Sequence, residues 1–504
     1  MEPATKNIGF DTEKYLEAQT EAILERVGKF EKLYLEFGGK LVSDGHAERV
    51  LPGYRPTAKI ELLKKLGDID IIYCVSAKHV EVGKVRADSG LSYDLQTLKE
   101  IRDIADHGLQ VKYVVITRCE NKASVAQFER KLERLGIEVF IHDEIPGYPN
   151  DLDQVIKGYE KESFVPANKK LTIVTGAGGN SGKMATCLSQ VYNERKNGIN
   201  SGYAKFETFP IWNLDLNHPV NIAYEAATAD LLDYNIIDPF HEKAYDKKVV
   251  NYNRDIENFD ILIAIMKKIT GEENPFGYKS PTDMGVNMAA KGIIDDAVCS
   301  EAGKQEIISR YFKYKKYYAE GIETKATMER IDEILEKMNL KAEDRKVVLP
   351  AREAAEDAST RDEKGNKGIF CGAALELPNG EIITGKNSPL LHAESAVVLN
   401  AIKAMANISD DIPLLPQSVI EDINYLKTQV LGEKTESLNL EETLIALSVS
   451  RSTNSTVRDC IAKLKDIKGC EFHSTHRLSN GDEAGARKLG LHVTTGAQAN
   501  VALN

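Results

Sequence analysis

The sequence predicts an α/β protein: a doubly wound parallel sheet with a P-loop-like turn, a helical middle domain and a small α/β domain at the C-terminal end. Three observations support this fold class. Short β-branched apolar runs alternate with amphipathic stretches in the first half, which favours a parallel sheet covered on both faces. A glycine-rich turn follows one of these runs. After about residue 256 the apolar spacing becomes helical, and near residue 368 it becomes that of strands again.

The strands of the large sheet are predicted from short apolar runs. In chain order these runs are Leu33–Phe37, Ile69–Val75, Val111–Thr117, Val139–His142, Leu171–Thr175 and Tyr203–Phe209. Helical spacing of apolar residues occurs between them, at Thr57–Leu66, Leu95–His107 and Lys122–Leu135. Strand, helix and strand in succession predict right-handed crossover connections.

The middle of the chain is predicted to be helical. Charged stretches with helical apolar spacing occur at Ile256–Thr270, Gly285–Val298, Glu301–Gly321 and Lys325–Met338. The segment Ala351–Lys367 is poor in apolar residues, which predicts a linker or an exposed segment. Strand-like runs then flank Asn379-Gly380, a strong hairpin signal. We therefore predict domains over residues 1–255, 256–357 and 358–504.

Composition and charge exclude several classes of protein. Lys and Arg number 65 and Asp and Glu 77 of 504 residues, so the net charge is −12. An acidic chain is unsuited to sequence-independent nucleic-acid binding, which depends on neutralising phosphates. The seven cysteines have no CxxC spacing, which predicts reduced thiols. No signal-peptide core and no run near the ~20 apolar residues of a membrane span is present, so we expect a cytoplasmic protein that does not bind membranes.

The glycine-rich turn predicts a phosphate cradle. The apolar run Leu171–Thr175 leads into Gly176, and a good helix begins after Lys183. Glycines let backbone N–H groups approach an anion, and the helix N-terminus adds a partial positive charge. The predicted nucleotide-binding residues of the turn are Gly176, Gly178, Gly179, Asn180, Ser181, Gly182, Lys183 and Thr186.

The turn departs from the strict Walker A spacing at two positions. Counted back from Gly182, the first glycine of that pattern is replaced by Ala177, and Met184 occupies the place of the magnesium-binding Ser or Thr. Thr186 or Ser181 is the substitute considered for that hydroxyl. Two alternatives stay open: a connection that serves only the turn, and a dinucleotide loop in which Glu207 binds a ribose hydroxyl.

Phosphoryl transfer also needs a carboxylate for magnesium and a group that stabilises developing charge. Asp238, after the run Asn235–Ile237, is the predicted metal ligand, and Glu207 is the second choice. Arg254 is the predicted charge stabiliser. Together with Lys183 these are the predicted catalytic residues, and the cofactor is magnesium with a nucleoside triphosphate.

Two further strand ends carry residues suited to anions. Gly38, Gly39 and Lys40 follow the run Leu33–Phe37, and Lys78 follows Ile69–Val75, with Arg86 and Asp88 beyond it. Ligands of α/β proteins bind at the carboxyl ends of parallel strands. We therefore expect Gly38, Gly39 and Lys40 to contribute to the same anion site as the glycine-rich turn.

The C-terminal region contains a pattern similar to that of cytidine deaminases. His392 and Glu394 follow the predicted hairpin and match the zinc-binding and proton-shuttling positions of that family. The Pro-Cys-x-x-Cys that completes its zinc site is absent. The similarity implies a deaminase-like topology without a competent zinc site. The alternative is a working zinc site formed by His392, Cys470 and His473.

Several longer segments are specific enough for comparison with a family: SGKMATCLSQVY, YAKFETFPIWNL, HPVNIAYEAATADL, YKSPTDMGVNMA and GCEFHST. On these segments the chain resembles a bacterial family, the domain-of-unknown-function family numbered eighteen-forty-six. The resemblance extends from Leu33 to near the C-terminus. It implies a chain of about this length and no particular activity.

The residues thus predict a nucleotide- or phosphate-dependent enzyme that transfers a phosphoryl group to a small acceptor. Alternatives are a non-catalytic nucleotide or phosphometabolite sensor, a dinucleotide oxidoreductase, and a zinc hydrolase or deaminase that acts through Glu394. The predicted partners are a small anionic or phosphorylated ligand and further copies of the chain, because the helical stretches with mixed faces can bury against another subunit.

Overall fold

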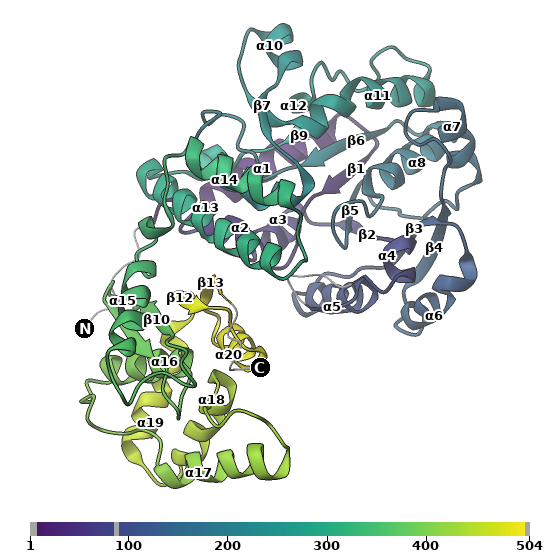
Figure 1. The fold of residues 1–504 in the computed structure, drawn as a ribbon. Coiled ribbons are helices and arrows are strands. Elements are labelled where there is room, and N and C mark those ends of the chain that lie inside the picture. The colour runs from purple at the N-terminus through teal and green to yellow at the C-terminus, as the bar shows by residue number, and fades with distance from the viewer. Residues whose placement is uncertain (1–7, 85–89, 499–504) are drawn as a thin grey trace. The chain divides into compact units, whose positions relative to one another are not determined.

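The computed structural model describes residues 8–84 and 90–498, and they form two compact units. The first unit is Ile8–Gly303 and the second begins at Lys304 (Figure 1). The stretch that we predicted as a separate helical domain is divided between the two units. Arg86 and Asp88 lie outside the described residues. Within the described residues, no helix combines the length and the apolar composition that crossing a membrane requires.

A seven-stranded sheet forms the centre of the first unit, and all its neighbouring strands are parallel. Its order is β4-β3-β2-β5-β1-β6-β9. The strands are β1 (Lys32–Phe37), β2 (Ile69–Ser76), β3 (Tyr113–Cys119), β4 (Glu138–Asp143), β5 (Leu171–Gly176), β6 (Ser201–Phe206) and β9 (Gly285–Val286). Each of the six apolar runs predicted as strands is confirmed in position.

The strand that leads into the glycine-rich turn, β5, lies between β1 and β2. Leu171 of β5 pairs with Leu33 of β1 and with Ile69 of β2, so the three strands start at about the same level of the sheet. β1 and the first five residues of β5 are buried, as expected for central strands covered on both faces. β2, β3 and β4 lie on one side of β5, and β1, β6 and β9 lie on the other, so the direction in which the sheet grows reverses at β5. This reversal creates a ligand-binding crevice at the carboxyl ends of open α/β sheets.

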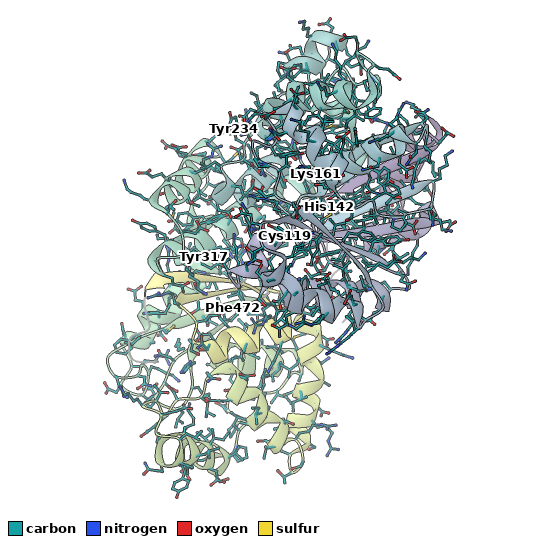
Figure 2. The ribbon with its side chains drawn as sticks, turned by 90° about the vertical axis from the view of Figure 1, so that its right-hand side faces the viewer. Cys119, His142, Lys161, Tyr234, Tyr317 and Phe472 are labelled. Atoms are coloured by element: carbon teal, nitrogen blue, oxygen red, sulfur yellow. The ribbon has the colours of Figure 1, made fainter. Side chains whose placement is uncertain are left out.

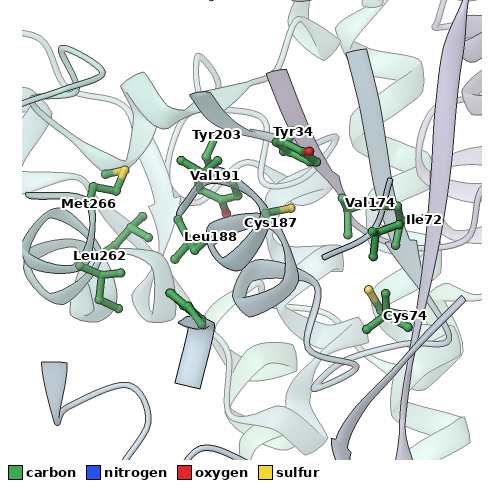
Figure 3. Close-up of a cluster of buried hydrophobic side chains, with 14 of the residues drawn as sticks. Tyr34, Ile72, Cys74, Val174, Cys187, Leu188, Val191, Tyr203, Leu262 and Met266 are labelled. Atoms are coloured by element: carbon green, nitrogen blue, oxygen red, sulfur yellow. The ribbon is translucent and has the colours of Figure 1, made fainter. Parts of the chain in front are cut away.

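The helix after the turn, α8 (Lys183–Lys196), is packed between the sheet and a second helix, α11 (Asn253–Thr270). Figure 3 shows Cys187, Leu188 and Val191 of α8 between strand residues and the α11 side chains Leu262 and Met266. α7 (Leu152–Lys161) packs against both helices. Because apolar groups enclose α8 on two sides, the position of its N-terminus is firmly fixed.

The other helices of the first unit complete its layers. Around the sheet are α1 (Thr12–Gly28), α2 (Gly45–Val50), α3 (Ala58–Leu66), α4 (Ala77–Glu81), α5 (Tyr93–Asp106) and α6 (Lys122–Glu133). After β6 come α9 (Pro219–Ala227), α10 (Pro239–Tyr245) and α12 (Pro281–Met284), with an antiparallel pair β7 (Asn235–Ile237) and β8 (Val250–Tyr252). The helix predicted for Gly285–Val298 is wrong: its first residues pair with β6 as β9, and α13 (Asp296–Ala319) starts only at Asp296.

The second unit contains a four-stranded mixed sheet in the order β11-β10-β12-β13. The strands are β10 (Gly372–Glu376), β11 (Ile382–Lys386), β12 (Glu471–His476) and β13 (His492–Gln498). β10 is antiparallel to β11 and β12, and β12 is parallel to β13. The hairpin predicted around Asn379-Gly380 is therefore confirmed.

The second unit also contains the helices that follow α13. They are α14 (Lys325–Lys337), α15 (Val348–Ser359), α16 (Ala393–Met405), α17 (Gln417–Tyr425), α18 (Leu440–Ser450), α19 (Ser455–Ala462) and α20 (Asn480–Leu489). α15 and α16 pack against the sheet. The linker predicted for Ala351–Lys367 is wrong in its first half, because Ala351, Ala354 and Ala358 are buried along one face of α15. Alanines are small enough for the helix to pack closely on the sheet. The many charged residues of the segment made this buried face hard to recognise in the sequence. All seven cysteines are buried and free of disulfides, as the sequence predicts.

Candidate functional site

The turn between β5 and α8 has a backbone that requires glycine at both ends. A Cβ atom at Gly176 would lie 2.4 Å from the carbonyl oxygen of Cys74 in β2. Gly182 has a φ of +81°, and a Cβ there would lie 2.7 Å from Oγ1 of Thr117 at the end of β3. L-residues avoid this left-handed region, and neither contact leaves room for a side chain. The turn is therefore built against the neighbouring strand ends.

α8 begins with exposed hydrogen-bonding capacity. Its N-cap residue is Gly182, and none of the described side chains accepts a hydrogen bond from its first N–H groups. The first intrahelical bond runs from the Thr186 N–H to the Gly182 carbonyl at 2.9 Å, so the N–H groups before Thr186 have no partner inside the helix. Lys183 stands in this first turn, and its Nζ donates to the Gly178 carbonyl at 3.3 Å. The ammonium group thus bridges the turn where N–H donors are free.

A cavity of about 340 Å³ lies beside the start of α8. The carboxyl ends of β3 and β4, marked by Cys119 and His142 in Figure 2, are neighbours in the sheet and border it together with β1. Its walls are formed by Glu36, Thr117, Arg118, His142, Asp143, Glu144, Ile145, Tyr148, Glu162 and residues 180–186. The lining therefore combines one helix N-terminus, one lysine and four carboxylates.

Glu36 is the carboxylate supplied by β1, the strand next to β5. It is 9% exposed and accepts a hydrogen bond from the Tyr203 hydroxyl at 2.7 Å. It lines the same cavity as Lys183 and Thr186. A buried carboxylate on the strand adjacent to a phosphate-type loop is suitably placed to bind a cation that accompanies phosphate. Sequence reasoning missed Glu36, although a charge within the apolar run Leu33–Phe37 is an available signal.

Glu162 and His142 form the opposite wall of the cavity. The His142 Nδ1 lies 3.5 Å from Glu162 Oε2, and its Nε2 lies 3.0 Å from the Ser163 carbonyl oxygen. Burial raises the pKa of Glu162 above its ordinary value, although the neighbouring imidazole acts to lower it. A carboxylate with a raised pKa accepts protons more readily than a solvated one.

A cationic rim borders the same cavity. The Arg118 Nε donates to Glu144 at 3.0 Å, and Lys78 lies 3.2 Å from the other oxygen of that carboxylate. Partial burial acts to raise the pKa of Glu144, but the hydrogen bonds from Arg118 and Lys78 hold it below its usual value. Lys78, which follows β2, thus reaches the cavity rim from its strand end.

The structure does not bring Asp238, the metal ligand predicted from sequence, to this cavity. Asp238 Oδ1 accepts hydrogen bonds from the N–H groups of Phe240 and His241, and therefore caps α10. Its Oδ2 accepts from the Thr282 hydroxyl at 2.7 Å. These bonds occupy both oxygens of a fully buried side chain. The apolar run before Asp238 belongs to the separate β7–β8 pair, which the sequence pattern did not distinguish from a strand of the main sheet.

Glu207 and Arg254 belong to another polar cluster, near the carboxyl end of β6. Glu207 Oε1 lies 2.8 Å from the Lys205 ammonium, which also contacts Asp255. Burial raises the pKa of Glu207 to about 8, although Lys205 acts to lower it. Arg254 donates to Asp233 at 2.6 Å. Neither predicted catalytic residue lines the cavity beside Lys183.

The segment Gly38–Lys40 is also separate from that cavity, since none of its three residues is in the described lining. The Lys59 ammonium donates to the Gly38 carbonyl at 3.1 Å and pairs with Asp44 at 2.9 Å. Both side chains of this ion pair are largely buried. The buried Lys59 ammonium thus binds the backbone of the segment that the sequence predicted to bind an anion.

In the second unit, His392 and Glu394 lie at the start of α16 and come together with Asp482 of α20. His473 is not part of this group: its Nδ1 lies 2.9 Å from Thr494 Oγ1, and its ring packs against Phe312. Side chains alternate along a strand, so the next residue, Ser474, faces Glu394 instead and donates to it at 2.6 Å. The predicted zinc alternative with Cys470 and His473 is therefore not the arrangement observed.

Comparison with known proteins identifies the family of the chain. The family model described as "Domain of unknown function DUF1846, N-terminal" matches residues 8–339, and its C-terminal counterpart matches residues 343–501. The chain belongs to the DUF1846 family. A Clostridium botulinum (strain Okra / Type B1) relative named "UPF0371 protein" is 51% identical over 491 residues, 97% of each chain. A relative of the same name from Clostridium tetani is 50% identical over 490 residues, again 97% of each chain.

Proposed function

We propose that the first unit binds the phosphate groups of a nucleoside triphosphate, or of a similar phosphorylated molecule, and transfers a phosphoryl group to a small acceptor. The observation that carries this proposal is the open start of α8, where Lys183 bridges the turn beside free N–H groups and a cavity. Anions bind at such helix N-termini because N–H donors and the helix dipole act together.

The acidic lining of the cavity points to a metal complex of the phosphate. Glu36, Asp143, Glu144 and Glu162 line it, and of the cations there Arg118 is already paired with Glu144. A free phosphate would be repelled by this surplus of carboxylates, whereas magnesium phosphate would not. Magnesium is held in such sites by one or two carboxylates and the phosphates, and it neutralises the charge that develops on the transferred group. Glu36 is the carboxylate that we assign to it.

The residues of the chain then have separate roles. The N–H groups of the first turn of α8 bind and orient the phosphates, and the Lys183 ammonium turns from the Gly178 carbonyl to their oxygens. Glu162, whose pKa is raised by burial, receives the proton of the acceptor hydroxyl. His142 borders this carboxylate, with its Nδ1 3.5 Å from Glu162 Oε2.

Binding of ATP, GTP and pyrophosphate, each with and without magnesium, tests the cradle by calorimetry. Lys183→Ala should weaken binding by about 1.5–3 kcal/mol, roughly 10- to 150-fold, because a charge-assisted hydrogen bond is lost. Lys196→Ala is the matched control: Lys196 lies at the other end of α8 and its side chain is 60% exposed. Equal affinities of the two variants for every phosphate compound would contradict the proposal.

Glu36→Gln tests the metal ligand separately. The amide keeps an oxygen for the Tyr203 hydroxyl, but it removes the negative charge. We expect the magnesium dependence of binding to disappear while magnesium-free binding is kept or improved, since a repulsive charge is lost. An unchanged magnesium dependence would exclude Glu36 as the ligand. Formation of nucleoside diphosphate, the leaving group whether the acceptor is a small molecule or water, is measured over time and distinguishes turnover from the non-catalytic sensor.

A further inference from the structure

A groove in the second unit follows one edge of its four-stranded sheet. The volume of the groove is about 1300 Å³, and every residue from Glu381 to Lys386, all of β11 included, lines it. β11 is the strand at one end of the order β11-β10-β12-β13. α16 and residues of the segment 408–424 form the other walls. This cavity, the β11 groove, shares no lining residue with the phosphate cavity of the first unit.

The backbone of β11 has unused hydrogen-bond donors on the side away from β10. Antiparallel strands direct the backbone groups of successive residues alternately towards and away from the partner strand. On the β10 side, the Asn387 N–H donates to the Cys371 carbonyl. Thr384 therefore points away from β10, and the Asn400 side chain of α16 donates to its carbonyl at 2.9 Å. Within the described residues, no acceptor is found for the N–H groups that face the same way, those of Ile382, Thr384 and Lys386.

A strand edge with unused N–H groups can pair with an extended chain. The β11 groove is larger than the roughly 300–1,000 Å³ of most small-molecule sites. At ~3.4 Å per residue, β11 is long enough to pair with about five residues. We propose that the β11 groove binds an extended peptide segment of another protein, which adds to β11 as a fifth, antiparallel strand. The antiparallel direction is the more stable of the two per residue.

The walls of the groove favour a single strand over a second copy of the chain. The apolar side chains of Leu399, Leu414 and Ile420 line the groove together with β11. Alternate side chains of a guest strand can pack on them. Because residues of the segment 408–424 form a second wall, the groove has room for one extended chain but not for the edge of another sheet with its helices.

The direction of α16 fixes which residues lie at each end of the groove. Gly385, near the end of β11, lies against the start of α16, since a Cβ there would be 2.7 Å from the Ala393 carbonyl oxygen. Thr384, one residue earlier in the strand, contacts Asn400, which is further along the helix. α16 thus runs antiparallel to β11, and the end of α16 lies beside the start of the strand.

The end of the groove near Lys386 is basic. The Gly365 N–H donates to the Asn387 carbonyl at 2.9 Å, which places Lys364 beside the end of β11. Asp357, a carboxylate near this end, is already paired with Lys386. Lys364 lines the groove and has no ionic partner among the described residues. Its ammonium group is therefore available to an acidic side chain of a guest.

The end of the groove near Glu381 is acidic. Lys403, close to the end of α16, lies 3.5 Å from Asp410 Oδ1, and the next residue, Asp411, lines the groove without an ionic partner in the described part of the chain. An antiparallel guest has its amino end beside Lys386 and its carboxyl end beside Glu381. The fitting segment therefore carries an acidic residue first, alternating apolar residues next and a basic residue last.

Selection from a displayed library of random peptides of about twelve residues, with the full-length chain as target, tests the proposal. Enriched peptides should share the order acidic, apolar, basic. Their affinity is then measured by fluorescence anisotropy. Thr384→Pro removes one outward N–H and should weaken binding about five- to tenfold; proline is tolerated at such edge positions. Thr384→Val is the matched control, because it keeps the N–H, and it should bind within about twofold of wild type.

Reversing both charged ends tests the orientation without altering the backbone. The double variant Lys364→Glu, Asp411→Lys should prefer peptides with the two charged residues exchanged, by at least about threefold. Circular dichroism confirms folding, and if Thr384→Pro does not fold, this preference decides. No common order among enriched peptides, or equal binding by Thr384→Pro and Thr384→Val, would overturn the proposal. So would a dimer that Thr384→Pro abolishes, because a second copy would then occupy the groove. Lys183→Ala should bind the peptides as wild type does.

Discussion

The helices α8 and α16 begin in similar backbone settings but carry side chains of opposite charge in their first turns. Each begins shortly after a strand, and neither has a side-chain cap among the described residues. α8 has no acidic residue in its first turn and places Lys183 there. α16 places Glu394 in its first turn and receives Asp482 from α20. The first turn of α8 thus places an ammonium group beside backbone N–H groups, whereas the first turn of α16 is surrounded by two carboxylates and the histidine that pairs with one of them.

The largest effect that would break this comparison is expected for Gly182→Ala. The substituted residue would be strained at a φ of +81° and would collide with Thr117, where a Cβ comes within 2.7 Å. Strain and overpacking together should lower the free energy of unfolding by about 2–5 kcal/mol. Stabilisation by magnesium phosphate compounds should also be lost, because the first turn of α8 moves. Thermal melts with and without pyrophosphate measure both.

Gly198→Ala is the control for that substitution. Gly198 has the same φ of +81°, but no atom lies within 4 Å of a Cβ placed there. Its variant should lose only about 1–2 kcal/mol, from backbone strain, and should keep ligand stabilisation. If both variants behave alike, the contact with Thr117 has no role in shaping the turn.

The comparison also shows what the sequence could and could not predict. The glycines, Lys183 and the apolar strand before them predict the phosphate-type turn, because strand, turn and helix are local in the chain. The carboxylate that lines the same cavity as Lys183 depends on strand order: β5 lies between β1 and β2, far from both in sequence, and this order brings Glu36 to the cavity. No spacing rule contains that information.

The same limit explains the residues that were predicted and then found elsewhere. Asp238 follows an apolar run, as a metal-binding carboxylate at a strand end would, but that run pairs with β8 and not with β5. His392 and Glu394 were recognised from their pattern, whereas Asp482 was missed because it lies on α20, which only the fold brings to α16. Motifs that are local in the chain were therefore predictable, whereas Glu36 and Asp482, which only the fold brings to these motifs, were not.

An intermediate change in stability is expected for Asp238→Ala. This variant tests the difference between α8, which has no side-chain cap among the described residues, and α10, which is capped by Asp238. The Asp238 side chain accepts three backbone N–H bonds and the Thr282 hydroxyl bond. Loss of the cap and of the buried partner should lower the free energy of unfolding by about 2–3 kcal/mol. Affinity for magnesium phosphate should stay unchanged, in contrast to Lys183→Ala. If Asp238→Ala also weakened the binding of magnesium phosphate, Asp238 would have to be part of the phosphate site.

Asp151→Ala is the control for the cap alone. Asp151 caps α7 through a single bond from the Gln154 N–H at 3.1 Å, in an exposed setting. Its loss should cost about 1 kcal/mol. Urea denaturation of both variants measures the difference, which reports the additional bonds of the buried Asp238 side chain, including the one to Thr282.

The smallest change in stability at neutral pH is expected for Glu207→Gln. Glu207 is paired with Lys205, whereas Glu36 lines the cavity beside Lys183. Burial raises the pKa of Glu207 to about 8 in the folded chain, against the opposing effect of Lys205. A carboxyl group whose pKa rises on folding contributes stability below its unfolded pKa, and this contribution is lost as the pH rises through about 8. The wild type should therefore lose melting temperature as the pH rises from the ordinary value of 4.5 to about 8, and the variant should lose less over this range.

Glu25→Gln separates this effect from general changes in surface charge. The side chain of Glu25 is 74% exposed, so its removal should leave the pH profile unchanged. Magnesium-dependent phosphate binding should survive in Glu207→Gln and disappear in Glu36→Gln, because only Glu36 lines the cavity beside Lys183. The opposite result would move the metal from the end of β1 to the end of β6. The position of Glu36 on a strand next to β5 would then not identify the metal ligand. The ion pair with Lys205 would also not prevent Glu207 from binding the metal.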